Sequence, residues 1–137
     1  MTLSEESLPY VRAISPYQPG KPITELAREM GLAVAQIVKL ASNENPLGMS
    51  PKARAAVLAA VDDLARYPDQ FALLQALSEH SGVGVGQIVL GNGSNDVLDL
   101  VARVFLAPGR SAVFAQYAFA VYPLATLAAG AEPIAVA

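Results

Sequence analysis

A short glycine-rich loop is the part of this sequence best suited to binding a ligand. Residues 91–95 read Gly-Asn-Gly-Ser-Asn and come just before a segment with helical periodicity. Gly91 and Gly93 would let the backbone turn sharply and approach a ligand that a Cβ atom would obstruct. Free N–H groups and the dipole at a helix N-terminus favour an anion, so this loop could hold a phosphate group. An ordinary strand-to-helix turn capped by Ser94 is the alternative, and the loop alone leaves both interpretations open.

Two well-known phosphate-binding motifs do not fit this loop. A dinucleotide-binding motif requires Gly-x-Gly-x-x-Gly, and Asp96 stands where the third glycine would be. A Walker loop ends in Gly-Lys-Ser or Gly-Lys-Thr, but no lysine follows Lys52. The residues therefore favour a phosphate-bearing cofactor other than a dinucleotide or a nucleoside triphosphate.

Composition and charge argue against several classes of function. Hydrophobic residues make up 53% of the chain and charged residues 15%, against about 45–50% and about 25% in typical soluble domains. We therefore expect more chain or a partner to cover part of the surface. The net charge is −3 and the nine Lys and Arg residues are scattered, which argues against nucleic-acid binding. Cysteine is absent, so disulfides and thiolate metal sites are excluded, and no metal site is expected.

Neither a membrane span nor an export signal is expected. The first six residues contain two glutamates and no basic residue, whereas a signal peptide starts with a basic patch and an apolar run. Residues 111–130 contain no charged residue, and about 20 residues suffice to span a bilayer. That stretch contains Gln116 and Pro123, however, and no Lys or Arg follows it. A buried strand and helix explain it better, and we expect a cytoplasmic protein.

Chain breakers and periodicity predict the elements that position the loop. Residues 1–22 are rich in proline and are expected to form an irregular arm. Helices are expected over residues 23–31, 51–65 and 70–81, and a brief strand over residues 37–41.

In the second half of the chain, the pattern of apolar segments and chain breakers predicts a βαβαβ order. The expected strands are residues 88–90, 112–114 and 133–136, and the expected helices are residues 95–106 and 118–128. Short apolar strands alternating with helices indicate an α/β protein with an open sheet covered on both faces. Because nothing follows the last strand to cover the sheet, we expect the front part of a larger protein.

Five motifs occur along the chain in a fixed order. They are Ser-Pro-Tyr-Gln-Pro-Gly-Lys-Pro at residues 15–22, Ser-Asn-Glu-Asn-Pro-Leu-Gly at 42–48, Arg-Tyr-Pro-Asp at 66–69, the loop at 91–95, and Tyr-Ala-Phe-Ala-Val-Tyr-Pro at 117–123. This order resembles that of histidinol-phosphate aminotransferases and covers nearly the whole chain. Each motif alone is weak, but the five together are specific. The resemblance implies a fold-type-I, class I/II pyridoxal-phosphate enzyme, a homodimer with a parallel-rich α/β large domain.

The resemblance also gives matching residues their roles toward pyridoxal 5'-phosphate. Gly93, Ser94 and Asn95 match the loop that holds the cofactor phosphate. Phe119 matches the aromatic residue that stacks on the pyridine ring, and Tyr67 the tyrosine that reaches the neighbouring subunit's cofactor phosphate. Without the resemblance, Phe119 would be an ordinary apolar helix residue and Tyr67 a helix-ending aromatic.

Two further residues match positions on the substrate side. Tyr17 lies in the arm and Asn43 in the polar turn, and in the family both segments close over the site. Without the resemblance, Tyr17 would be a surface anchor and Asn43 a turn-forming asparagine. The single histidine, His80, is expected to be a solvated residue near a helix end.

No catalytic residue is assigned to this chain. Pyridoxal-phosphate catalysis needs a Schiff-base lysine that also moves a proton, an acid at the pyridine nitrogen and usually an arginine for the substrate carboxylate. In the family all three lie beyond the position of residue 137. The lysines present are Lys21, Lys39 and Lys52, and none falls in a segment that matches the lysine motif. We expect the chain to be inactive by itself.

The activity implied is transamination between glutamate and imidazole-acetol phosphate, a step of histidine biosynthesis. The implied organisation is an N-terminal arm and short helix over residues 1–36, then the first part of the cofactor-binding large domain over residues 37–137. Two alternatives stay open. One is a related enzyme on the same scaffold, such as an aromatic aminotransferase or a threonine-phosphate decarboxylase. The other is an inactive fragment that pairs with a partner.

Overall fold

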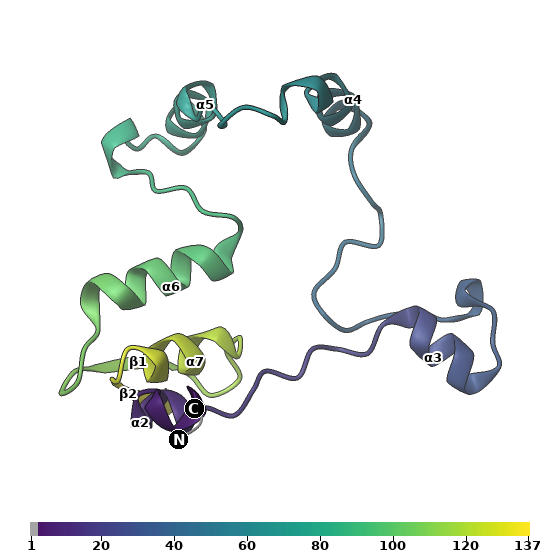
Figure 1. Ribbon diagram of the computed structural model, residues 1–137. Helices are drawn as coiled ribbons and strands as arrows, with labels where there is room; N and C mark the ends of the chain where they lie inside the picture. Colours follow the sequence, from purple (N-terminus) through teal and green to yellow (C-terminus); the bar gives the residue numbers. More distant parts are fainter. Residues whose placement is uncertain (1–2) are drawn as a thin grey trace. The chain divides into compact units, whose positions relative to one another are not determined.

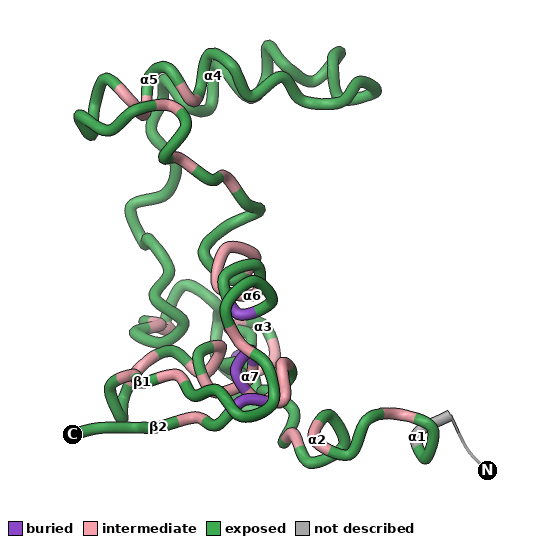
Figure 2. The backbone as a smooth tube through the Cα atoms, turned by 90° about the vertical axis from the view of Figure 1, so that its left-hand side faces the viewer, coloured by how far each residue is buried: buried purple, intermediate pink, exposed green. Residues whose placement is uncertain are grey.

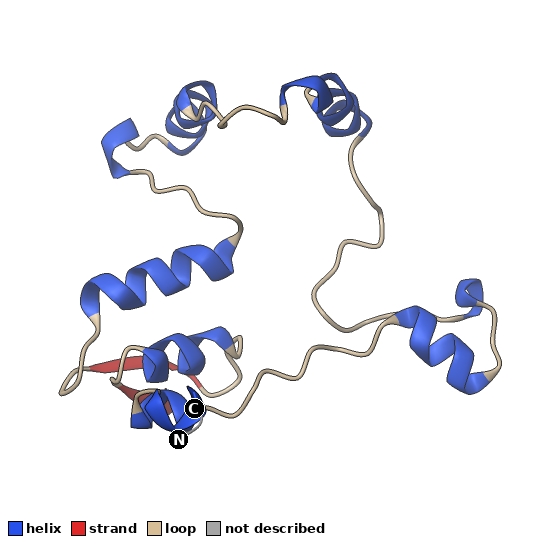
Figure 3. Cartoon of the chain, in the orientation of Figure 1, coloured by secondary structure: helices blue, strands red, loops and turns tan. Residues whose placement is uncertain are grey.

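The computed structural model describes residues 3–137, which form two compact units (Figures 1 and 3). We call the first the sheet unit; it joins the N-terminal residues up to Tyr17 with Leu74–Ala137. The second, Gln18–Leu73, is called the helical unit. None of the helices in residues 3–137 combines the length and apolar character that crossing a bilayer requires.

The sheet unit is built around one parallel strand pair. Strands β1 (Ser111–Ala115) and β2 (Glu132–Val136) pair in parallel, with Val113 opposite Ile134. Helix α7 (Val121–Ala128) connects them, and the ring of its Tyr122 stacks on Phe114 of β1 with 6.1 Å between the ring centroids. The two strands and α7 confirm the second half of the expected order to within a few residues.

Small side chains form the buried centre of this unit (Figure 2). Helix α6 (Ser94–Phe105) packs against α7, and each helix contributes a buried alanine, Ala102 and Ala125. Thr126 is also buried, and its hydroxyl donates to the carbonyl oxygen of Tyr122 at 2.7 Å. Because alanine projects only a methyl group, the two helix backbones can approach closely at this contact.

The N-terminal arm contains more regular structure than expected. It forms two single-turn helices, α1 (Leu3–Glu6) and α2 (Pro9–Arg12). Pro9 occupies the first position of α2, where the missing N–H would have no partner in any case. The expectation of an irregular arm is therefore wrong for these residues and holds for residues 14–22.

The expected strands at residues 37–41 and 88–90 do not form. Both segments follow a single 3₁₀ turn, η1 (Val34–Gln36) and η3 (Val85–Gln87), and neither pairs with a strand within residues 3–137. A strand exists only through ladder hydrogen bonds to a neighbour, which the local sequence does not reveal. The expected βαβαβ order is thus corrected, for the described residues, to α6 followed by one βαβ unit.

The helices expected over residues 23–31, 51–65 and 70–81 all form, although the second is shorter than expected. Helix α3 (Ile23–Met30) ends at Gly31, which has the left-handed φ of 64°. Helix α4 (Pro51–Ala59) starts at Ser50, whose Oγ accepts a hydrogen bond from the Ala53 N–H at 3.1 Å. Helix α5 (Phe71–Ser81) begins at the end of this unit and continues into the sheet unit.

Helix α4 is shorter than expected. It ends at Ala59 rather than near residue 65, and a 3₁₀ turn, η2 (Val61–Asp63), continues the chain. Asp62 and Asp63 follow the helix C-terminus, where the helix dipole disfavours negative charge.

The close contact between α6 and α7 gives a stability prediction. Replacing Ala125 by leucine would force a larger side chain into the buried contact, and overpacking of this kind costs about 1–3 kcal/mol. Ala55 is exposed in the middle of α4, so Ala55→Leu should change stability by no more than about 0.5 kcal/mol. Chemical denaturation of both variants measures the difference. Equal stability of the two would contradict a tightly packed α6–α7 contact.

Candidate phosphate-binding site

The loop before α6 has the geometry of an open helix N-terminus. Gly93 is the cap residue, with φ of 90°, a conformation that strongly favours glycine. Its N–H donates to the carbonyl oxygen of Gly91 at 2.8 Å, which closes a tight turn. The Gly93 position offers no side chain to cap the helix. The N–H groups of Ser94 and Asn95, in the first turn, have no carbonyl partner inside the helix and can bind an anion.

Asp96, rather than Ser94, stabilises the loop. Its carboxylate oxygen Oδ2 accepts a hydrogen bond from the Asn92 N–H at 2.9 Å. A Cβ atom on Gly91 would lie 2.8 Å from Val97 Cγ2 and 3.0 Å from Asp96 Oδ2, so the loop also needs glycine there. The side chains of Ser94 and Asn95 are exposed and have no hydrogen bond within residues 3–137. The interpretation of Ser94 as a simple helix cap is therefore wrong.

The role of Asp96 in holding the loop was not predicted from the sequence. The signal was present, because an acidic residue at the third helical position commonly reaches back to N–H groups before the helix.

An open cleft of about 510 Å³ lies between α6 and α7 next to this loop. Its lining includes Asn92 and Asn95 of the loop, Ile14 of the arm and Leu124 of α7. The charged groups of the lining, Asp96 and Asp99, are both acidic. The cleft itself is thus unsuited to an anion, and the N–H groups at the start of α6 are the better anion site.

Phe119 lies on a turn between β1 and α7 and not on the helix where it was expected. The turn is fixed by hydrogen bonds from Gln116 N–H to Val136 O at 2.7 Å and from Ala118 N–H to Ala115 O at 2.9 Å. Helix α7 begins at Val121, which places Pro123 in its first turn. A helix starting at Ala118 would put Pro123 where an N–H is needed, and this explains the later start.

Phe119 meets Tyr17 of the N-terminal arm. Their ring centroids are 6.3 Å apart and the ring planes stand at 82°, an edge-to-face arrangement. Both rings stay about half exposed, Phe119 at 48% and Tyr17 at 52%. The fold thus brings together two residues that the motifs singled out from opposite ends of the chain.

Asn43 and Tyr67 both belong to the helical unit. Ser42 and Asn43 have left-handed φ values of 71° and 50°, and the asparagine that holds the turn is Asn45. Its amide oxygen accepts from the Leu47 N–H and its amide nitrogen donates to the Gly48 carbonyl, both at 3.0 Å. The Asn43 side chain has no hydrogen bond within residues 3–137, and Tyr67 is fully exposed.

The end of the arm lies against this polar turn. A Cβ atom on Gly20 would be only 2.7 Å from the Ser42 hydroxyl oxygen. Glycine at residue 20 therefore allows the arm and the turn to approach each other closely inside the helical unit.

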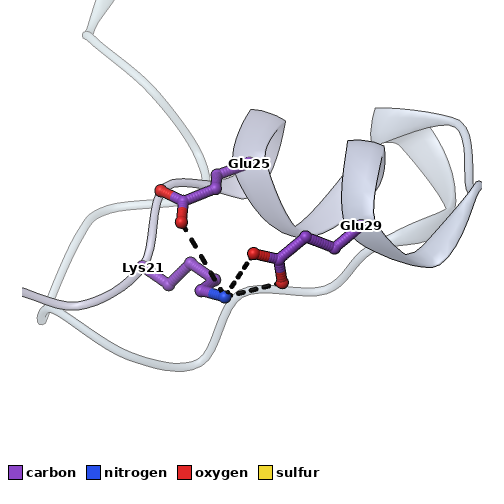
Figure 4. Close-up of polar contacts among 3 residues, drawn as sticks. All are labelled: Lys21, Glu25 and Glu29. Carbon is purple, nitrogen blue, oxygen red and sulfur yellow. Dashed lines mark hydrogen bonds and ion pairs between the residues drawn. The ribbon is translucent and has the colours of Figure 1, made fainter.

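Two of the three lysines are held in ion pairs. Lys21 contacts both carboxylate oxygens of Glu29, at 2.8 and 2.6 Å, and lies 3.8 Å from Glu25 (Figure 4). The hydrogen bond to Glu29 raises the pKa of Lys21 above its usual value, and so does the charge of both glutamates. Lys39 pairs with Glu44 at 2.7 Å.

The ion pair with Glu29 disfavours covalent chemistry at Lys21. A lysine that forms a covalent bond to a carbonyl must be able to lose its proton, and nearby carboxylates oppose that loss. His80, in the last turn of α5, is exposed as expected. Within residues 3–137, no group of acidic and histidine side chains is arranged to hold a metal ion.

Comparison with solved structures supports the α/β fold. The chain resembles the crystal structure of histidinol-phosphate aminotransferase from Sinorhizobium meliloti in complex with pyridoxal-5'-phosphate. The TM-score is 0.72 at 23% sequence identity, over 93% of this chain and 34% of that one. The expected fold class, an incomplete α/β fold of the aminotransferase type, is confirmed.

Curated relatives are much more similar in sequence. The chain is 75% identical to histidinol-phosphate aminotransferase 1 of Dechloromonas aromatica (strain RCB), over 98% of this chain and 37% of the relative. It is 70% identical to the protein of the same name from Thiobacillus denitrificans, over 94% of this chain and 34% of the relative. The chain thus spans about a third of the length of these relatives.

A family model gives the classification. The model described as aminotransferase class I and II matches residues 35–137, which is most of the chain. That range includes the polar turn, Tyr67, the loop before α6 and Phe119. The chain belongs to the aminotransferase class I and II family.

Proposed function

We propose that this chain is the cofactor-phosphate-binding part of a histidinol-phosphate aminotransferase that uses pyridoxal 5'-phosphate. The reaction is amino-group transfer between glutamate and imidazole-acetol phosphate in cytoplasmic histidine biosynthesis. The main support is the start of α6 after Gly93, where no side chain caps the helix. The chain is also 75% identical to a histidinol-phosphate aminotransferase.

The residues of the loop fit the phosphate end of this cofactor. Gly93 provides the turn, and the N–H groups of Ser94 and Asn95 provide donors that are already oriented. The Ser94 hydroxyl and the Asn95 amide add donors that nothing else in residues 3–137 engages. The Asp96 carboxylate is held by the Asn92 N–H, which keeps the loop closed while the helix N-terminus stays available.

Phe119 and Tyr17 fit the ring and substrate ends of the same site. Pyridoxal 5'-phosphate, when bound, acts as an electron sink for the bonds of the amino acid's α-carbon. Phe119 would stack on its pyridine ring, and the perpendicular contact with Tyr17 restricts how Phe119 can turn. The Tyr17 hydroxyl would then be placed to donate to the substrate phosphate.

The proposal also gives roles to Asn43 and Tyr67, which belong to the helical unit. Asn43 presents a free amide from a turn held by its neighbour Asn45, which suits a substrate contact. Tyr67 is fully exposed, as a residue that reaches the cofactor phosphate of a neighbouring subunit must be before assembly. In this organisation residues 1–36 are an arm with a short helix, residues 37–137 begin the large domain, and the enzyme is a homodimer.

The covalent lysine, the acid at the ring nitrogen and the carboxylate-binding arginine are not assigned to residues 1–137. Lys21 and Lys39 are paired with glutamates, which supports this part of the proposal. The role of this chain is to hold the cofactor phosphate, cover the ring and contribute to the substrate pocket.

Substitution of Ser94 tests the phosphate site. Ser94→Ala removes one donor to a charged phosphate, a loss of about 1.5–3 kcal/mol or roughly ten- to a hundredfold in cofactor dissociation constant. Ser50 is a matched control, because its hydroxyl also lies at a helix start but is used as a cap. Equilibrium dialysis of the complete enzyme with pyridoxal 5'-phosphate measures Ser94→Ala and Ser50→Ala side by side. An unchanged constant for Ser94→Ala would refute the assignment.

Substrate preference tests the reaction. The complete enzyme should transfer an amino group from glutamate to imidazole-acetol phosphate with a much higher kcat/KM than to phenylpyruvate, because Tyr17 and Asn43 would contact a phosphorylated substrate. Steady-state kinetics with both acceptors measures the ratio. A preference for phenylpyruvate would instead indicate an aromatic aminotransferase on the same scaffold.

The missing covalent lysine gives a third test. A protein made of residues 1–137 alone should show no transamination above the rate of free pyridoxal 5'-phosphate, since none of Lys21, Lys39 and Lys52 lies in a segment that matches the family's lysine motif. A coupled assay for 2-oxoglutarate formation detects any turnover. Activity that survives purification and responds to Ser94→Ala would contradict this part of the proposal.

A further inference from the structure

The N-terminal arm contacts the α7 region at three places in the sheet unit. Tyr10 of α2 lies against Gly130, just after the end of α7. Ile14 helps line the cleft together with Val121 and Leu124 of α7. Tyr17 meets Phe119, just before α7 begins. Successive arm residues therefore contact progressively earlier positions of the α7 region.

The contact between Tyr10 and Gly130 is close. A Cβ atom on Gly130 would lie 3.2 and 3.3 Å from Tyr10 Cε1 and Cζ, and 3.1 Å from Pro108 Cγ. Gly130 also has a left-handed φ of 72°. Glycine is thus favoured here for two separate reasons, the backbone conformation and the space that the tyrosine ring occupies.

Apolar contacts are what hold this arm. The hydrogen bonds that residues 9–17 make within residues 3–137 are all local to the arm, such as that from Arg12 to the Glu5 carbonyl at 3.2 Å. Of the three contacts with the α7 region, that of Tyr10 is at the end of α7 opposite to Phe119.

We propose that Tyr10, seated against Gly130 and Pro108, is a positioning residue that holds the arm along α7 and so places Tyr17 at Phe119. This inference rests on the proposed function for the substrate role of Tyr17. Tyr10 itself touches neither substrate nor cofactor. It acts by keeping the arm docked, so its loss raises the fraction of molecules in which Tyr17 is displaced.

Matched variants of the complete enzyme separate this contact from general destabilisation. Tyr10→Ala removes the ring, and Gly130→Ala places a methyl group against it. Gly82→Ala is the control, because Gly82 has the same φ of 72° but open space where the Cβ would be. Tyr10→Phe keeps the atoms that make the contact and should restore wild-type behaviour.

The first readout is tryptic cleavage after Arg12 in the folded holoenzyme. Cleavage of a docked segment follows its opening equilibrium, so Tyr10→Ala and Gly130→Ala should be cut roughly tenfold faster. Gly82→Ala and Tyr10→Phe should stay within about twofold of wild type. Wild-type cleavage rates for both Tyr10→Ala and Gly130→Ala would overturn the contact, whatever the enzyme's substrate.

The second readout is the split between KM and kcat for the keto acid that the enzyme accepts best. Tyr10→Ala should raise KM several-fold and leave kcat and the affinity for pyridoxal 5'-phosphate near wild type, because Tyr17 acts on the substrate side. Faster cleavage with an unchanged KM would overturn the positioning role. Since the cleavage assay does not depend on turnover, it stands even if the substrate is not imidazole-acetol phosphate.

Discussion

Parallel pairing of β1 with β2 requires a crossover between them, and α7 is that crossover. The register of the two strands fixes where the chain leaves β1, and the turn carrying Phe119 follows at once. One hydrogen bond, from Gln116 N–H to Val136 O at 2.7 Å, ties that turn to the far strand. The position of the proposed ring-stacking residue therefore depends on the strand pair, and so does the helix against which α6 packs.

The loop before α6 and the turn at Phe119 are held in different ways. The loop relies on glycine conformations and on one carboxylate, Asp96, that accepts from the backbone of Asn92. The turn relies on ladder hydrogen bonds and on ring contacts with Tyr17. The loop leads into α6 and the turn leads into α7. These two helices pack together through alanines rather than through large side chains, so their backbones can lie close to each other.

Local signals predicted the helices well and the strands less well. Ser50 before Pro51, and Gly31 after Met30, marked helix ends that the structure confirms. Residues 88–90 looked like a strand but are unpaired within residues 3–137, because pairing depends on distant chain. Motif order located the loop and Phe119, whereas the helix start at Val121 and the role of Asp96 needed the three-dimensional arrangement. The roles of all the proposed site residues stay predictions: Gly93, Ser94, Asn95, Phe119, Tyr67, Tyr17 and Asn43.

The contacts of Tyr10 with Gly130 and of Tyr17 with Phe119 join the two ends of the sequence. Closing so long a loop costs conformational entropy before any contact compensates for it, so such contacts form late in folding. The βαβ unit and α6 can assemble from neighbouring segments, but the arm has no surface to dock on until α7 is complete. We therefore expect the arm to be the last part of the sheet unit to fold and the first to detach in a local unfolding event.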